Sequence, residues 1–422
     1  MSQQTEKSQD AIAHEHTAEQ HSLFGREESK VILPLDPFPW YRTMRETRSV
    51  RYNQEGKTWE IFRYEDVFRV VNDHAAFSSE QVMREQPQTQ RDQPQTQREQ
   101  SQNQDEEFAR SLLSTDPPRH RHLRSLISQA FTPRTIAQLT PRITEIVDDY
   151  LERVATGGRM DVIADLSYPL PVIVIAEMLG IPSAERDQFK RWSDAIVSTA
   201  REEAMQAGRE MNRYFKKIID QRRIEPRDDL ISSLIATQVE GEHLTESELL
   251  SFCVLLLVAG NETTTNLLGN AIICFDEHPE VMEQLRDDPA LIPSAIEEVL
   301  RYLSPVQLLV RVATSDIVLG GQEIKAGQFV VPWLGAANRD EAQFPDPDTF
   351  DIRRAPNRHV AFGHGIHFCI GAPLARLETK IALGAILERF SEIRRDRTIP
   401  IERIPSSFVY GVKQLPITFR TR

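Results

Sequence analysis

The chain has 422 residues, enough for two or three ordinary domains or for one large domain with a deep interior. Its 40% hydrophobic and 27% charged residues are typical of a soluble globular protein, and its net charge of −13 argues against nucleic acid as a general partner. Three scattered cysteines exclude a disulfide framework and favour a reducing compartment. The N-terminal residues show no signal peptide, and no apolar run approaches the ~18 residues of a membrane span. We therefore predict a soluble, cytoplasmic protein.

The first part of the chain predicts a polar tail followed by a small β element. Residues 1–32 are rich in Gln, Glu, Ser and His, and we expect them to be disordered. Residues 49–52 and 58–62 alternate in polarity around a turn, which predicts a β-hairpin, and a helix is expected over 65–72. Because no linker divides the rest, residues 33–422 are predicted to form one domain.

A tandem repeat of seven residues fills positions 84–104. Its period matches a coiled-coil heptad, but no apolar residue occupies any core position, and two of the three copies contain proline. We interpret the repeat as a flexible, low-complexity expansion at the surface.

The remaining chain is predicted to be mostly helical. Thr132-Pro133 is typical of a helix start, and apolar residues continue at helical spacing to Val154. A long helix is expected over 246–275, interrupted at Gly260, and another over 292–302. Short strands are expected between Val310 and Trp333. These elements predict a mainly α fold with a small β region.

The strongest chemical motif is a glycine-rich loop, 362–371, that contains Cys369 and leads into a helical segment. A thiolate needs backbone N–H groups and a helix N-terminus to hold its charge, and glycines let the backbone approach a flat cofactor. A single thiolate held in this way suits axial ligation of haem iron. Two other interpretations are a small buried cysteine and a partial zinc site with His364 and His367, although no second cysteine lies nearby.

Three weaker motifs lie upstream of this loop. Glu298 and Arg301 lie one helical turn apart, a spacing that is also common in surface ion pairs. Glu262-Thr263 interrupts an apolar helix, where the threonine hydroxyl can bond back to a main-chain carbonyl; a tolerated polar kink is the alternative. His120 and Arg124 lie one turn apart and could hold an anionic group together.

In this order and spacing the motifs resemble those of the soluble bacterial cytochromes P450, which are haem-thiolate monooxygenases, from about Pro34 onward. The resemblance implies a single large P450-type fold enclosing a b-type haem, with Cys369 as the axial ligand of the metal. It also implies a buried charge network of Glu298, Arg301 and Arg354. Thr263 would hydrogen-bond dioxygen and Glu262 would deliver protons through water, with Thr264 as the alternative alcohol.

The resemblance assigns further residues to the haem and to the substrate. The predicted haem contacts, four of them to the propionates, are His120, Arg124, Arg311, His367, Phe362, Gly363, Gly371, Ala259 and Gly260. The predicted pocket residues are Leu256, Ala259, Val306, Leu309 and Phe408. The repeat at 84–104 would lie in the loop over the pocket entrance.

The implied reaction inserts one atom of O2 into a C–H or C=C bond of a small apolar molecule, with a steroid or terpenoid favoured over fatty acids and polyketides. Two electrons would come from a ferredoxin or flavodoxin with its NAD(P)H reductase, because no flavin domain is present on this chain. The partner would dock on the cysteine side near Arg119, Arg121 and Arg124, and the protein is expected to be a monomer. The alternatives are a peroxygenase driven by hydrogen peroxide and a non-enzymatic haem sensor or electron carrier.

Overall fold

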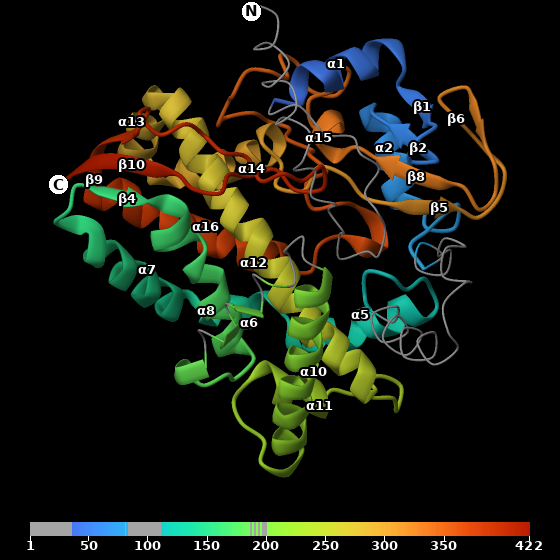
Figure 1. Ribbon diagram of the computed structural model, residues 1–422, viewed down its shortest axis with the longest axis horizontal. Coiled ribbons are helices and arrows are strands. Elements are labelled where there is room, and N and C mark those ends of the chain that lie inside the picture. The colour runs from blue at the N-terminus through green and yellow to red at the C-terminus, as the bar shows by residue number, and fades with distance from the viewer. Residues whose placement is uncertain are drawn as a thin grey trace, which may run out of the picture.

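Helices dominate the structure, a computed structural model that describes residues 36–80, 82, 111–185, 188–189, 191–192, 195 and 201–422 (Figure 1). The described α-helices are α1 Phe38–Thr47, α2 Tyr64–Asn72, α5 Arg119–Ala130, α6 Pro133–Gln138, α7 Thr140–Ala155, α8 Pro169–Met178, α10 Arg201–Ile224, α11 Leu230–Ala236, α12 Glu246–Glu277, α13 Pro279–Asp287, α14 Ile292–Tyr302, α15 Leu334–Ala337 and α16 Ala372–Arg389. The predicted tail at 1–32 and the repeat at 84–104 lie outside the described residues.

Three small sheets accompany the helices in the described residues. The five-stranded sheet has the order β1-β2-β8-β5-β3, with β1 Val50–Asn53, β2 Thr58–Ile61, β8 Phe329–Pro332, β5 Arg311–Ala313 and β3 Phe77–Ser78. The three-stranded sheet has the order β4-β10-β9, with β4 Arg159–Asp161, β10 Pro416–Thr421 and β9 Phe390–Arg395. A hairpin joins β6 Ile317–Leu319 to β7 Gln322–Ile324. The predicted mainly α fold with a small β region is therefore confirmed.

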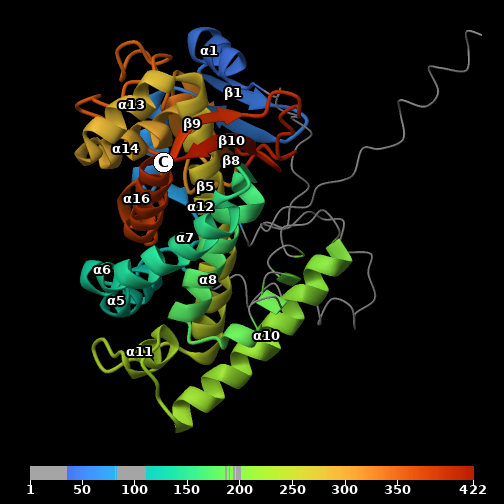
Figure 2. The same cartoon turned by 90° about the vertical axis from the view of Figure 1, so that its left-hand side faces the viewer.

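The long helix α12 crosses the centre of the molecule (Figure 1). Its start is fixed by a capping box, in which the Glu248 N–H donates to Thr245 Oγ1 at 3.3 Å and the Thr245 N–H donates to Glu248 Oε2 at 2.9 Å. Buried residues follow on every side of the helix, which is the pattern of a helix enclosed by others. It packs against α8, α10, α14 and α16. Figure 2 shows α10 and α11 at the end of the molecule opposite the five-stranded sheet.

Several predicted elements are confirmed by the structure. The hairpin forms with Val50 opposite Ile61, the helix expected over 65–72 is α2, and the helix expected over 292–302 is α14. The short strands expected between Val310 and Trp333 are β5 to β8. These predictions depended on local periodicity and on turn residues, which act within a few positions of the chain.

Two predicted helices were wrong in detail. The single helix expected from Thr132 to Val154 is divided into α6 and α7, because Pro141 has no N–H to continue a helix and instead lies in the first turn of α7. The interruption expected at Gly260 is absent, and α12 is continuous from Glu246 to Glu277. A Cβ atom at position 260 would lie 2.6 Å from Ile175 Cδ1 of α8. Glycine at 260 therefore allows α12 and α8 to pack closely.

Candidate functional site

Cys369 lies in a tight loop that ends at the N-terminus of α16. The Cys369 N–H donates to the Phe362 carbonyl at 2.9 Å, which closes the loop on itself. Gly363 and Gly365 both have left-handed backbone angles, with φ of 67° and 68°, and a Cβ at Gly365 would approach Asn72 Oδ1 to 3.1 Å. The loop therefore needs glycine at these two positions to bring the cysteine to the start of the helix.

The surroundings of the Cys369 sulfur favour a thiolate more than those of the other cysteines do. Burial raises the pKa of Cys369, but N–H groups of Gly371 and Ala372 donate to the sulfur, and the charges of Arg124 and Arg376 also oppose the shift. Cys253 and Cys274 are fully buried in α12, and burial raises the pKa of both well above the ordinary value. The partial zinc site is not supported, since no group of three metal-ligating side chains occurs among the described residues.

The middle of α12 has accessible residues in an otherwise buried helix. Ala259 is exposed and Glu262 and Thr263 are partly exposed, although the helix around them is buried. Thr263 Oγ1 donates to the Ala259 carbonyl at 2.7 Å, the bond that the sequence predicted. Thr264 is buried, which distinguishes Thr263 as the accessible alcohol.

Glu262 precedes Thr263 in α12 and is likewise partly exposed. No hydrogen bond or ion pair joins it to another residue in the part of the chain that the structure describes. Burial raises the pKa of Glu262, so this carboxyl takes up and releases its proton at a higher pH than an exposed glutamate does.

The four predicted propionate contacts converge from three separate segments. His120 and Arg124 lie on α5, Arg311 begins β5, and His367 precedes the cysteine in its loop. The rings of His120 and His367 have centroids 4.3 Å apart. The structure therefore brings together two histidines and two arginines that are far apart in the sequence.

This cluster carries the charges of Arg124 and Arg311, and Asp116 Oδ1 lies 4.0 Å from His367 Nε2. Burial, together with Arg124, lowers the pKa of His120 to about 4, and burial, together with Arg311, lowers that of His367 to about 2. Burial also lowers the pKa of Arg311 to about 10. The Nε2 atoms of His120 and His367 are buried without a hydrogen-bond partner. An anionic group would satisfy these atoms and stabilise the charges.

The three predicted network residues also meet. Glu298 and Arg301 are fully buried, and Arg301 Nε and Nη2 donate to the two carboxylate oxygens of Glu298 at 2.8 and 2.7 Å. Arg354 Nε donates to Glu298 Oε1 at 3.2 Å. The other donors of the two guanidinium groups reach main-chain carbonyls of Asn338, Pro345, Asp346, Pro347 and Thr349. The network thus holds a segment of irregular backbone in place.

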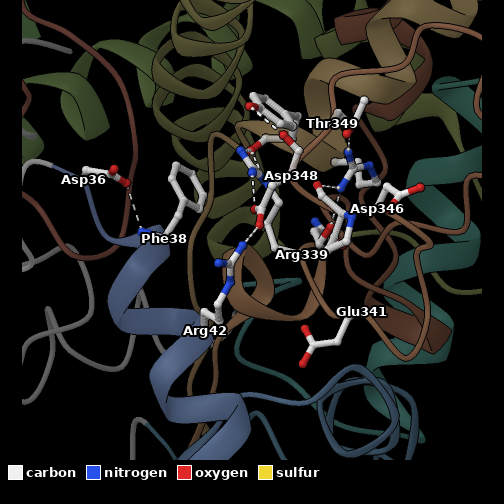
Figure 3. Close-up of polar contacts among 12 residues, drawn as sticks. Asp36, Phe38, Arg42, Arg339, Glu341, Asp346, Asp348 and Thr349 are labelled. Atoms are coloured by element: carbon white, nitrogen blue, oxygen red, sulfur yellow. Dashed lines mark hydrogen bonds and ion pairs between the residues drawn. The ribbon is translucent and has the colours of Figure 1, made fainter.

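A further buried cation, Arg339, extends this arrangement and was not assigned a role from the sequence. It donates to the Tyr302 carbonyl at 3.0 and 2.8 Å and to Asp348 Oδ1 at 2.8 Å. Arg42 of α1 reaches the same aspartate from the other side, so Asp348 joins the first helix to the network (Figure 3). The burial of Arg339 depends on these contacts with distant segments.

The predicted pocket residues come from three parts of the chain. Leu256 and Ala259 lie on α12, and Val306 and Leu309 follow α14. The segment containing Phe408 pairs with the chain at 305–307, where the Gln307 N–H donates to the Phe408 carbonyl at 2.8 Å. The structure therefore places Val306 and Phe408 in neighbouring segments.

Comparison with known proteins agrees with this geometry. Residues 171–419 match the family model described as cytochrome P450. The chain is 42% identical to mycinamicin IV hydroxylase/epoxidase of Micromonospora griseorubida, over 84% of this chain and 88% of that protein. The chain belongs to the cytochrome P450 family.

Solved structures support the same assignment. Substrate-free CYP109E1 from Bacillus megaterium is 42% identical, with a TM-score of 0.85 over 92% of this P450 and all of that chain. Its complex with corticosterone gives a TM-score of 0.82 over 91% and 98% of the two chains. The predicted P450-type fold is confirmed, and the protein is a P450 monooxygenase. No helix in the described part of this P450 is long and apolar enough to span a membrane.

Membership of the family implies a haem cofactor, and the residues present fit one. The sulfur of Cys369 faces N–H groups, as an anionic ligand requires. The unpartnered Nε2 atoms of His120 and His367 lie with Arg124 and Arg311 in a cationic cluster, which suits the two carboxylates of haem. The donor set and the buried polar atoms are therefore those that haem would satisfy.

Proposed function

We propose that this P450 inserts one atom of O2 into a C–H or C=C bond of a small apolar substrate, and that Cys369 would ligate the iron of haem b. The observation that carries the proposal is the Cys369 sulfur, which receives the N–H groups of Gly371 and Ala372 at the start of α16. Haem, when bound, supplies the redox centre at which dioxygen is reduced and split. His120, Arg124, Arg311 and His367 would bind and orient its propionates.

Glu262 and Thr263 are proposed to manage the protons that the reaction consumes. Thr263 is accessible beside Ala259, and the raised pKa of Glu262 favours proton exchange.

We expect Thr263→Ala to lower the product formed per NAD(P)H several-fold and to raise the hydrogen peroxide released. Glu262→Gln should slow turnover by about 100-fold, since it removes a proton-transfer group. Product, NAD(P)H and peroxide are measured together, and Thr264→Val is the matched control.

The proposed substrate class is a steroid. The support is the apolar character of Leu256, Val306, Leu309 and Phe408, together with the corticosterone bound by the similar CYP109E1. Titration with corticosterone, a terpenoid and a fatty acid, followed by the shift in haem spin state, would rank the three classes. A shift with the terpenoid or the fatty acid alone would reject the steroid.

The electron donor is proposed to be a ferredoxin or flavodoxin with its NAD(P)H reductase, bound on the cysteine side. The basic surface there is smaller than the sequence suggested, because Arg119 is bonded to Glu248 and lies 3.3 Å from Glu242. Arg121 and Lys380 remain exposed, and Phe368, 39% exposed, lies next to Cys369. Exposed cations and an exposed aromatic residue next to the cysteine suit an acidic partner.

The test of the proposed reaction is turnover under isotopically labelled O2 with a ferredoxin, its reductase and NADPH. We expect one labelled oxygen atom in the product and the other in water. Product with hydrogen peroxide but none with the electron donors would instead identify a peroxygenase. If the protein binds haem but forms no product, and if no substrate shifts the haem spin state, the protein would be a sensor or an electron carrier.

A further inference from the structure

Glu297, next to the buried network residue Glu298, has a different set of partners. Arg376 of α16 donates to it twice, from Nε to Oε1 at 2.7 Å and from Nη2 to Oε2 at 2.8 Å. His359 Nε2 lies 3.0 Å from Oε2. This planar, two-point geometry is the strongest form of an arginine–carboxylate pair. Glu297 therefore joins α14 to α16 and to the segment before the cysteine loop.

Arg376 contacts the cysteine loop itself, and His359 contacts the residue just before it. The Ala361 N–H donates to His359 Nδ1 at 3.3 Å, so the proton of His359 lies on Nε2 and is donated to Glu297. The guanidinium carbon of Arg376 lies 4.6 Å from the centre of the Phe362 ring. The Phe362 carbonyl in turn accepts the N–H of Cys369. One carboxylate thus positions two sides of the loop.

The electrostatic role of Glu297 follows from the charges around it. Burial acts to raise the pKa of Glu297, but Arg376 and His359 outweigh it and hold the pKa at about 2. Arg376 attracts negative charge on Cys369 and favours the thiolate. Because Glu297 is ionised at every ordinary pH, it cancels much of the arginine charge at the sulfur.

We propose that Glu297 is a positioning residue that sets the electron density on the Cys369 sulfur, and so the reduction potential of the haem, by fixing and neutralising Arg376 over Phe362. The inference rests on the proposed role of Cys369 as the haem ligand. A cation left uncompensated near the thiolate would stabilise the reduced haem, which carries one more negative charge, and an uncompensated anion would destabilise it.

The experiment measures the midpoint potential of the haem-loaded enzyme and its variants. Glu297→Gln should raise the potential and Arg376→Gln should lower it, each by about threefold to tenfold in the reduction equilibrium, or about 30–60 mV for one electron. The double variant should return close to the starting value. Glu297→Asp, which keeps the charge, should shift the potential less than Glu297→Gln. Arg389→Gln, which breaks an ion pair with Asp148 near the end of the same helix, is the matched control and should cause no shift.

Opposite signs for the two single variants support the proposal, because loss of a merely structural contact would move both in the same direction or neither. Potentials that are unchanged, or that shift in the same direction, would overturn it. If Glu297→Gln does not yield folded protein, the midpoint potential of Arg376→Gln alone tests the proposal. A lowered potential supports it, and an unchanged or raised potential overturns it. The reduced, CO-treated spectrum of each variant is recorded first. If the unmodified enzyme lacks the thiolate signature, Cys369 is not the ligand. That result would reject the proposed function and not the role of Glu297 by itself.

Discussion

Replacing Glu298 by glutamine is expected to lower the free energy of unfolding by about 3–5 kcal/mol, because it leaves the buried guanidinium group of Arg301 and the half-buried one of Arg354 without their counter-charge. Arg301 and Arg354 both bond its carboxylate, and so do the Asp351 N–H at 2.9 Å and Asn357 Nδ2 at 3.1 Å. Either orientation of a glutamine amide turns its NH2 group toward at least two of these donors. The loss is therefore both of charge and of hydrogen bonds.

Denaturant unfolding and the fraction of protein that retains haem would measure this effect. Glu283→Gln makes the same chemical change at an exposed position of the neighbouring helix α13, and it should cost well under 1 kcal/mol. If Glu298→Gln is too unstable to purify, Asn357→Ala removes one neutral donor and should cost about 1 kcal/mol. A Glu298→Gln protein as stable as the Glu283→Gln control would show that the network does not hold the fold.

Cys369→Ser is expected to abolish the strongly red-shifted Soret band of the reduced, CO-treated protein and to reduce product formation to background. A serine hydroxyl is a much weaker acid and a poorer electron donor than a thiol, so the N–H groups of Gly371 and Ala372 cannot hold it as an anion. The absorption spectrum before and after reduction in CO is the measurement. It requires no knowledge of the substrate.

Cys274→Ala is the matched control for this change. Cys274 is fully buried in α12 and burial raises its pKa, so its replacement should leave the red-shifted band in place. Haem with the same spectrum in Cys369→Ser would return Cys369 to the role of a small buried residue. Loss of the band in Cys274→Ala but not in Cys369→Ser would place the ligand elsewhere.

Local features of the chain were predictable because their causes lie within one or two helical turns. The Glu298–Arg301 pair has helical spacing and forms its bonds within α14. Thr132 caps the helix that begins at Pro133, and its Oγ1 accepts the Thr135 N–H at 3.1 Å. The resemblance of the cysteine loop and of the distant Arg354 to a known family supplied what local spacing could not.

The amino-acid sequence by itself determined the family, the ends of helices such as α14 and the residue types at the candidate haem site. Only the tertiary structure decided which charges are free. Arg119 is paired with Glu248, 129 residues away, and Arg376 with Glu297, 79 residues away. Which alcohol in α12 is accessible was likewise decided by the helices packed against it. The physical reason is that burial and ion pairing depend on segments that meet only after folding. Such long-range contacts produce no regular spacing of residues that could be recognised in the sequence.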